Sequence, residues 1–242
     1  MKRLIKFIPY FIIISVIIVL FFLFCKSETA SVSNTDVPVI IIDAGHGGVD
    51  GGAVAADGTQ EQYINLDIAL RLEKALTEKG YRTVMTRTDN NSLHDESAES
   101  IREKKVSDLN NRLEIIKQYP DSIFVSIHQN YYSETRYWGA QVFYSQNNSL
   151  SAVLAQCIQD DIVSQIQPEN TRQIKKSGKS IYLLYNSYVP SVMVECGFLS
   201  NYEETKRLND DEYRQQMADV ICNAIIKYIN GGYAENNTVG ED

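Results

Sequence analysis

Three short apolar stretches of the chain each lead into a residue that can bind a metal ion or transfer a proton. The residues that follow them are His46, His128 and Glu195; the stretches themselves are residues 39–42, 123–127 and 192–194. Open α/β sheets bind ligands beyond the carboxyl ends of their strands, so these side chains should converge on one crevice. The chain has only three histidines. Two of them stand at such positions, which makes a metal-dependent enzyme the leading hypothesis.

A catalytic zinc ion commonly has three protein ligands and keeps one position open for water. His46 and His128 offer the two nitrogen ligands, and the glycines around His46 suit a loop whose backbone passes close to a ligand. A carboxylate should complete the site, and the candidates are Asp43, Asp50, Glu61 and Glu195. The spacing does not choose among them, because an acidic residue at the helix start expected near Glu61 also favours the helix itself.

Glu195 is the acidic residue that is hardest to explain by structure alone. It stands at the end of an apolar strand, where a carboxylate is costly to bury unless it is paired or functional. A general base beside a metal-activated water is the functional interpretation. A buried ion pair with an arginine such as Arg87 is the structural one. His94 lies in a polar, acidic segment and is expected away from the metal.

Four segments, in order, resemble motifs of the zinc-dependent N-acetylmuramoyl-L-alanine amidases. They are PVIIIDAGHGGVDGGA at 38–53, Glu61 with Asn65-Leu66, FVSIHQN at 124–130 and VECGFLSN at 194–201. The resemblance covers the chain from about Val37 to Tyr228. It implies that His46, Glu61 and His128 bind Zn²⁺ and that Glu195 is the catalytic carboxylate. Asn130 would either orient the substrate or hold its own loop.

The resemblance also implies the reaction, which is hydrolysis of the amide between N-acetylmuramic acid and L-alanine in peptidoglycan. The expected partners are therefore glycan strands and stem peptides. The short architecture most resembles the CwlD-type amidases of the spore cortex, which implies a part in cortex maturation through muramic-lactam formation. A zinc carboxypeptidase or endopeptidase of stem peptides is the alternative enzyme. A membrane-anchored wall-binding module with a structural zinc is the non-enzymatic one, and the need for an activating protein stays open.

Strands alternating with helices predict an α/β fold. We expect a three-layer sandwich in which a twisted, mostly parallel sheet has helices on both faces. Continuous apolar runs are typical of strands that are covered on both sides. Helices are expected from 61 to 80, from 108 to 120, from 149 to about 168, and around 217–228. The other expected strands are 81–86, 140–144, 181–184 and 191–195, and the polar residues 89–106 are expected to form a lid or a disordered insertion.

The N-terminus carries an apolar run from Ile8 to Cys25 behind three basic residues. Eighteen helical residues span about 27 Å, close to the hydrocarbon core of a bilayer. We therefore expect a signal anchor at 1–25, a linker at 26–36, a catalytic domain at 37–231 and a polar tail at 232–242. Single-pass insertion in the cell membrane or forespore envelope would place the catalytic domain on the extracytoplasmic side.

The overall composition is that of a globular protein, with 44% hydrophobic and 22% charged residues. The net charge of −8 argues against nucleic acid as a partner, since nucleic-acid binders normally present a basic surface. The four cysteines form no metal-binding spacing, and buried thiols are expected.

Overall fold

The computed structural model describes residues 37–231. The predicted anchor at 1–25, the predicted linker at 26–36 and the predicted tail at 232–242 lie outside the described residues. Within residues 37–231, no helix is long and apolar enough to cross a membrane. A compact unit of the chain begins at Pro38.

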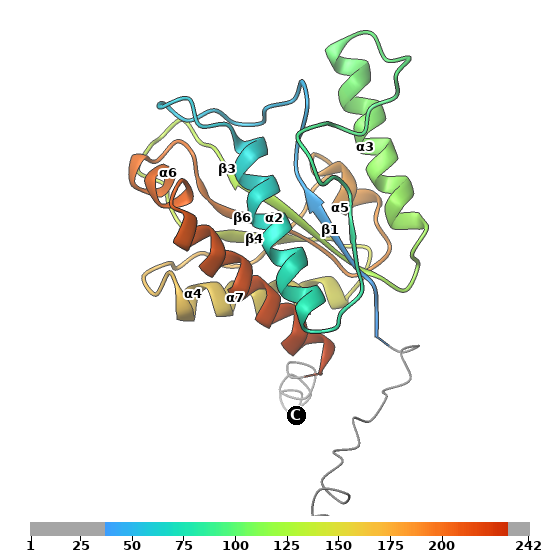
Figure 1. Cartoon of the computed structure of the whole chain (residues 1–242). Coiled ribbons are helices and arrows are strands. Elements are labelled where there is room, and N and C mark those ends of the chain that lie inside the picture. Colours follow the sequence, from blue (N-terminus) through green and yellow to red (C-terminus); the bar gives the residue numbers. More distant parts are fainter. Residues whose placement is uncertain (1–36, 232–242) are drawn as a thin grey trace, which may run out of the picture. The chain divides into compact units, whose positions relative to one another are not determined.

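The described unit alternates strands with helices, as predicted (Figure 1). In chain order the elements are β1 (Ile40–Ala44), α2 (Glu61–Glu78), β2 (Thr83–Met85), α3 (Ile101–Lys117), β3 (Ile123–Asn130), β4 (Gln141–Tyr144), α4 (Leu150–Gln165), β5 (Lys175–Lys176), α5 (Tyr182–Asn186), β6 (Ser191–Phe198), α6 (Tyr202–Leu208) and α7 (Asp211–Ile229).

The strands form one six-stranded sheet in the order β2-β1-β3-β6-β4-β5. β2, β1, β3 and β6 run parallel to one another, and β4 and β5 run parallel to each other. β4 runs antiparallel to β6, so the sheet is mixed rather than wholly parallel. The carboxyl ends of β1, β3 and β6 therefore lie at the same edge, where ligands collect in sheets of this class.

Apolar side chains cover both faces of the sheet. One apolar cluster combines buried residues of α2, α4 and α7 with one face of the sheet, and a second combines residues of α3 and α5 with the other face. β1 shows the division directly, because Ile40 and Ile42 belong to the first cluster and Ile41 to the second. Successive side chains of a strand point to opposite faces, so a continuous apolar run fits this arrangement.

Two predicted segments differ from the structure, and one helix was not predicted. Residues 181–184 were expected as a strand, but Tyr182–Asn186 form the helix α5. The prediction was wrong because the periodicity of a short apolar run does not distinguish a strand from a buried helix. Residues 89–106 do not form one long insertion, since α3 already begins at Ile101. Its polar first turns hid this start, although Ser100 and Glu103 form a capping box. The short helix α6, which Asn201 caps, was not predicted.

The cysteines within the described residues agree with the prediction. Cys157, Cys196 and Cys222 are buried free thiols, and Cys25 lies outside the described residues. They pack in the core and take no part in the arrangement at the strand ends.

A buried ion pair connects α3 to the end of β1. Nη1 of Arg112 donates to Oδ1 of Asp43 at 2.5 Å, and both side chains are almost fully buried. Thr86 and Ser126, from either side of β1, donate hydroxyl hydrogen bonds to the same carboxylate. Burial would raise the pKa of Asp43, but the charge of Arg112 and the hydrogen bond from Ser126 outweigh it and lower this pKa to about 2.

The same arginine, with a second one, holds the backbone that follows β1. Arg112 donates to the carbonyl oxygens of Ala44 and His46 at 2.8 and 2.6 Å. Arg87 donates to the carbonyls of Ala44, at 2.8 Å, and Gly45, at 3.0 Å. His46 has a φ of 62°, a left-handed conformation that is uncommon for a residue other than glycine. These guanidinium contacts fix the carbonyls on both sides of that turn.

We expect Arg112→Met to lower the free energy of unfolding by ~3–5 kcal/mol at neutral pH, because it leaves Asp43 buried without its partner. The folded-state pKa of Asp43 is depressed to about 2 from 3.8. The stabilisation from ionised Asp43 is therefore complete above pH ~4 and is lost as the pH falls towards 2. In urea titrations, the difference in free energy of unfolding between the wild type and the variant should therefore shrink as the pH falls from ~4 towards 2. Arg102→Met, at an exposed position of α3, is the control, and an equal loss there would contradict the assignment.

Candidate metal centre

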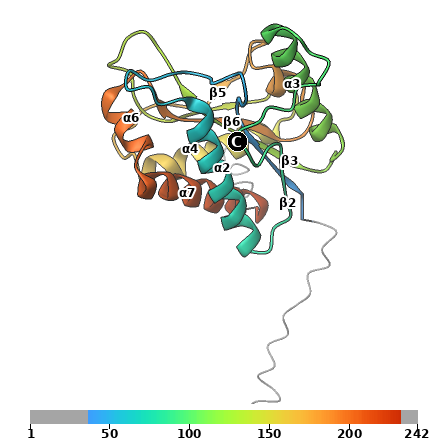
Figure 2. The ribbon, with the colours of Figure 1, turned by 45° about the horizontal axis from the view of Figure 1, so that its top comes forward.

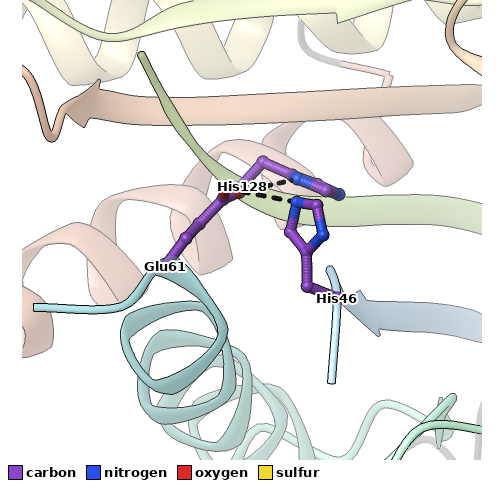
Figure 3. A group of neighbouring side chains, drawn as sticks. All are labelled: His46, Glu61 and His128. Atoms are coloured by element: carbon purple, nitrogen blue, oxygen red, sulfur yellow. Dashed lines mark hydrogen bonds and ion pairs between the residues drawn. The ribbon is translucent and has the colours of Figure 1, made fainter. Parts of the chain in front are cut away.

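Three side chains from three separate elements meet at the carboxyl edge of the sheet (Figure 3). His46 comes from the loop after β1, Glu61 is the first residue of α2, and His128 lies near the end of β3. Nε2 of His46 lies 3.2 Å from one carboxylate oxygen of Glu61, and Nδ1 of His128 lies 2.9 Å from the other. All three offer a ligand atom within 4.8 Å of the others, an arrangement that could hold a metal ion.

Backbone and amide groups fix the carboxylate of Glu61. The backbone N–H of Ala53 donates to Oε2 at 2.8 Å, and the backbone N–H of Gln129 donates to Oε1 at 3.0 Å. Asn65, one turn along α2, donates to Oε1 and to the carbonyl of Gly45. Burial opposes ionisation, but hydrogen bonds from His128 and His46 hold the pKa of Glu61 far below its ordinary value. Glu61 is therefore a negative charge at the centre of the site.

A carboxylate and a lysine stand behind His46. Nδ1 of His46 lies 3.0 Å from Oδ2 of Asp50, and Lys105 from α3 lies 2.8 Å from Oδ1 of the same residue. Because an ionised carboxylate only accepts hydrogen bonds, Asp50 favours the proton on Nδ1 and directs Nε2 towards Glu61. Burial lowers the pKa of His46, yet Asp50 and Glu61 raise it to about 9. Metal binding at His46 would therefore displace a proton.

Glycine is required at two positions where the backbone approaches the site. A Cβ atom added to Gly45 would lie 2.2 Å from Nε2 of His128. One added to Gly52, whose φ is 68°, would lie 2.5 Å from the carboxylate of Glu61 and 2.7 Å from the ring of His46. Any side chain at these positions would push the three candidate ligands apart, which explains the glycines that surround His46 in the sequence.

Glu195 lies beside the three residues on the neighbouring strand. It is the register partner of His128 in the parallel pairing of β3 with β6. Its Oε2 is buried and has no hydrogen-bond partner within the described part of the chain. Burial and the charge of Glu61 raise the pKa of Glu195 to about 7, against the opposing influence of His128. The proposed ion pair with Arg87 is wrong, because Arg87 donates to backbone carbonyls instead.

The donor set fits zinc. Two imidazole nitrogens and one carboxylate oxygen are the ligands of a common class of catalytic zinc site, which leaves a position open. The described residues offer three such groups rather than the four of a closed structural site. The buried, unpaired oxygen of Glu195 also fits a site that receives a further polar group.

The other candidate residues lie apart from the three ligands. Asp43 is held by Arg112, and Asp50 lies behind His46, so neither joins the group. His94 pairs with the hydroxyl of Ser92 at 2.6 Å. Asn130 is the last residue of β3, and its backbone carbonyl accepts a hydrogen bond from the N–H of Leu199. This contact does not involve the side chain, so the role of Asn130 in orienting the substrate stays a prediction.

Two supporting residues had not been identified in the sequence. Lys105 lies in the polar segment that was expected to form a lid, and nothing in its spacing indicates a contact with Asp50. Gln129 supports Glu61 through its backbone and Asn65 through its side chain. Asn65 was noticed only through the resemblance, although its spacing of four from Glu61 places both on one helix face.

Comparison with known proteins agrees with the geometry. Residues 40–227 match the family Amidase_3, described as N-acetylmuramoyl-L-alanine amidase. A germination-specific N-acetylmuramoyl-L-alanine amidase of Bacillus subtilis is 33% identical over 190 residues, which cover 78% of this chain and 79% of that protein.

Solved structures show the same similarity. The CwlD amidase of Clostridioides difficile, determined in complex with the GerS lipoprotein, is 40% identical with a TM-score of 0.77, over 80% of this chain and 98% of that one. The amidase AmiC2 of Nostoc punctiforme is 29% identical with a TM-score of 0.68, over 80% and 97% of the two chains.

We expect Asp50→Asn to weaken divalent-metal binding about 10- to 100-fold, the usual effect of removing a partner behind a ligating histidine. Zn²⁺ affinity would be measured on the apo protein by competition with a chromogenic chelator. Asp57→Asn is the matched control, since Asp57 is exposed in the same loop and binds Thr59 rather than a histidine. Equal affinity in Asp50→Asn and wild type would show that Asp50 does not support His46.

Proposed function

The chain belongs to the N-acetylmuramoyl-L-alanine amidase family and is a peptidoglycan amidase, and we propose that it works with a zinc ion held by His46, Glu61 and His128. The observation that carries this proposal is the meeting of the three side chains from the loop after β1, from α2 and from β3 beside an unpaired buried oxygen of Glu195. A bound zinc ion would supply Lewis acidity, polarising the scissile carbonyl and lowering the pKa of the attacking water.

Glu195 is suited to move the proton in this reaction. A carboxyl with a pKa of about 7 can accept a proton from the attacking water and return it to the leaving amine nitrogen of L-alanine near neutral pH. Glu61 is assigned the metal-binding part instead, because backbone N–H groups of Ala53 and Gln129 hold its two oxygens beside the histidine rings. The two carboxylates thus have separate tasks, set by their surroundings.

Two rival functions receive less support. A stem-peptide carboxypeptidase or endopeptidase would use the same chemistry, but the family match over residues 40–227 favours the amide at muramic acid. A purely structural zinc would favour four closed protein ligands, whereas the described residues offer three.

The biological setting is also a proposal. Similarity to a germination-specific amidase and to CwlD supports a role in spore-cortex maturation through muramic-lactam formation. Because CwlD was solved with the GerS lipoprotein, we propose that this chain also works with a protein partner. The apolar run at 8–25 supports a single-pass anchor with the amidase domain on the extracytoplasmic side.

We expect Glu195→Gln to retain its fold and its zinc content and to lose hydrolysis by at least 100-fold, since a neutral amide cannot accept the proton. Purified peptidoglycan would be incubated with the zinc-loaded protein and the products identified by mass spectrometry. The wild type should release stem peptides that begin at L-alanine. Shortened stems that remain on muramic acid would contradict the amidase, and full activity in Glu195→Gln would contradict the mechanism.

For the cortex proposal, we expect a strain that lacks this protein to form spores whose cortex contains no muramic lactam. The wild-type chain should restore the lactam, and Glu195→Gln should not. Muropeptide analysis of digested cortex measures both. Normal lactam content in the deletion strain would rule out this role while leaving the amidase activity intact.

A further inference from the structure

The loop at 131–139, which we call the aromatic loop, follows the strand that carries His128 and exposes large ring side chains. Tyr131 is 55% exposed, Tyr132 49% and Trp138 37%, and Tyr202 at the start of α6 is 76% exposed. A contiguous patch of solvent-exposed apolar side chains commonly marks a binding surface. The reaction described above leaves these rings unused.

The aromatic loop is anchored by residues that follow β6 and by Arg172 in the segment after α4. Asn201 donates to the carbonyl oxygens of Thr135 and Tyr137 at 2.9 and 3.3 Å, and Ser200 accepts the N–H of Tyr132. Nε of Arg172 donates to the carbonyl of Trp138 at 2.8 Å. A loop anchored at four points presents its rings with little conformational entropy to lose on binding.

The rings within the loop also support one another. Tyr132 packs edge-on against Tyr137 with 5.0 Å between ring centroids, and Tyr137 stacks on Phe198 at 6.5 Å. Phe198 ends β6, three residues after Glu195. The loop itself starts just after Asn130, two residues past His128, and its backbone lies beside α6 (Figure 2).

Three surface cavities border the aromatic loop and α6. The largest, of about 670 Å³, is lined by Thr135, Asn201 and Tyr202 among others. A second of about 440 Å³ and a third of about 280 Å³ share Trp138. Concave surfaces with exposed rings and a few hydroxyl and amide groups suit a polyhydroxylated ligand, whose ring C–H faces lie on aromatic rings while its hydroxyls bond to polar groups.

The charges at this surface favour a neutral ligand. Arg136 is paired with Glu134 at 2.7 Å, and Arg172 lies over the ring of Phe198, so both guanidinium groups are engaged. The largest cavity carries three acidic side chains and one lysine: Asp57, Glu203, Asp210 and Lys206. A stem peptide brings carboxylates of its own, which such a cavity would repel.

We propose that the aromatic loop and Tyr202 form a sugar-binding platform that holds the glycan strand of peptidoglycan while its muramoyl amide lies at the metal centre. This inference rests on the proposed function, because the glycan and the stem peptide leave the scissile bond in different directions. The platform assigns the glycan to the side of the molecule where α6 lies.

The test uses Trp138, the one tryptophan in the chain, as an intrinsic probe. Full-length protein would be titrated with chitohexaose, a neutral β-1,4-linked N-acetylglucosamine oligomer, while Trp138 emission is recorded. A saturable change is expected, and Tyr132→Ala and Tyr202→Ala should each raise the Kd at least fivefold. Tyr188→Ala is the control, since Tyr188 is 80% exposed but precedes the opposite end of β6. Tyr132→Ala removes a ring that packs on Tyr137 and could disturb the loop. Tyr202→Ala removes a ring that is mostly exposed to solvent, so it tests the platform without that risk to folding.

Several outcomes would overturn the platform. No saturable response to chitohexaose would do so, as would a response only to the free tripeptide L-Ala-γ-D-Glu-diaminopimelate. An unchanged Kd for chitohexaose in both variants would also contradict the platform. So would sedimentation velocity that shows the protein self-associating through these rings. Product analysis separates the two proposals: if the platform alone is wrong, stem peptides are still released and the variants keep the wild-type KM for peptidoglycan. If the amidase is wrong, no stem peptides appear even where chitohexaose binds.

Discussion

The buried ion pair between Asp43 and Arg112 joins the end of β1 to α3, two elements that lie far apart along the chain. Arg112 continues to the carbonyl of His46, and Arg87 holds the carbonyl of Gly45, so the left-handed turn at His46 is fixed from its backbone side. A buried charge pair contributes less to net stability than to geometry. Here that geometry determines where the imidazole of His46 points.

The site itself depends on two glutamates in unlike surroundings. Glu61 accepts hydrogen bonds from two histidines and two backbone N–H groups, which keep it ionised. Glu195 has a buried oxygen without a partner, and burial raises its pKa to about 7. The same functional group can therefore serve as a ligand at one position and as a proton acceptor at the next strand. The parallel register of β3 and β6, which pairs His128 with Glu195, is what brings them together.

The aromatic loop continues from the end of β3 and packs against the end of β6. It therefore connects the proposed metal centre to the surface beside α6. Ser200 and Asn201 hold this loop, and Phe198 supports its rings. The residues that follow Glu195 in the chain thus both end the catalytic strand and build the neighbouring surface. The proposed proton acceptor and the proposed sugar-binding surface are thus joined by a few consecutive residues of the chain.

The sequence by itself determined the α/β class, the three strands that place His46, His128 and Glu195 at or near their carboxyl ends, and the start of α2 at Glu61. These depend on local periodicity and on residue types that the chemistry requires. The spacing of the acidic residues did not identify the third metal ligand, and only the resemblance to the amidase motifs indicated Glu61. The tertiary structure decided that Asp43 pairs with Arg112, that Asp50 and Lys105 stand behind His46, and that Tyr182–Asn186 form the helix α5 rather than a strand. Each of these depends on contacts between residues distant in the chain, and no local pattern encodes which buried charge meets which partner.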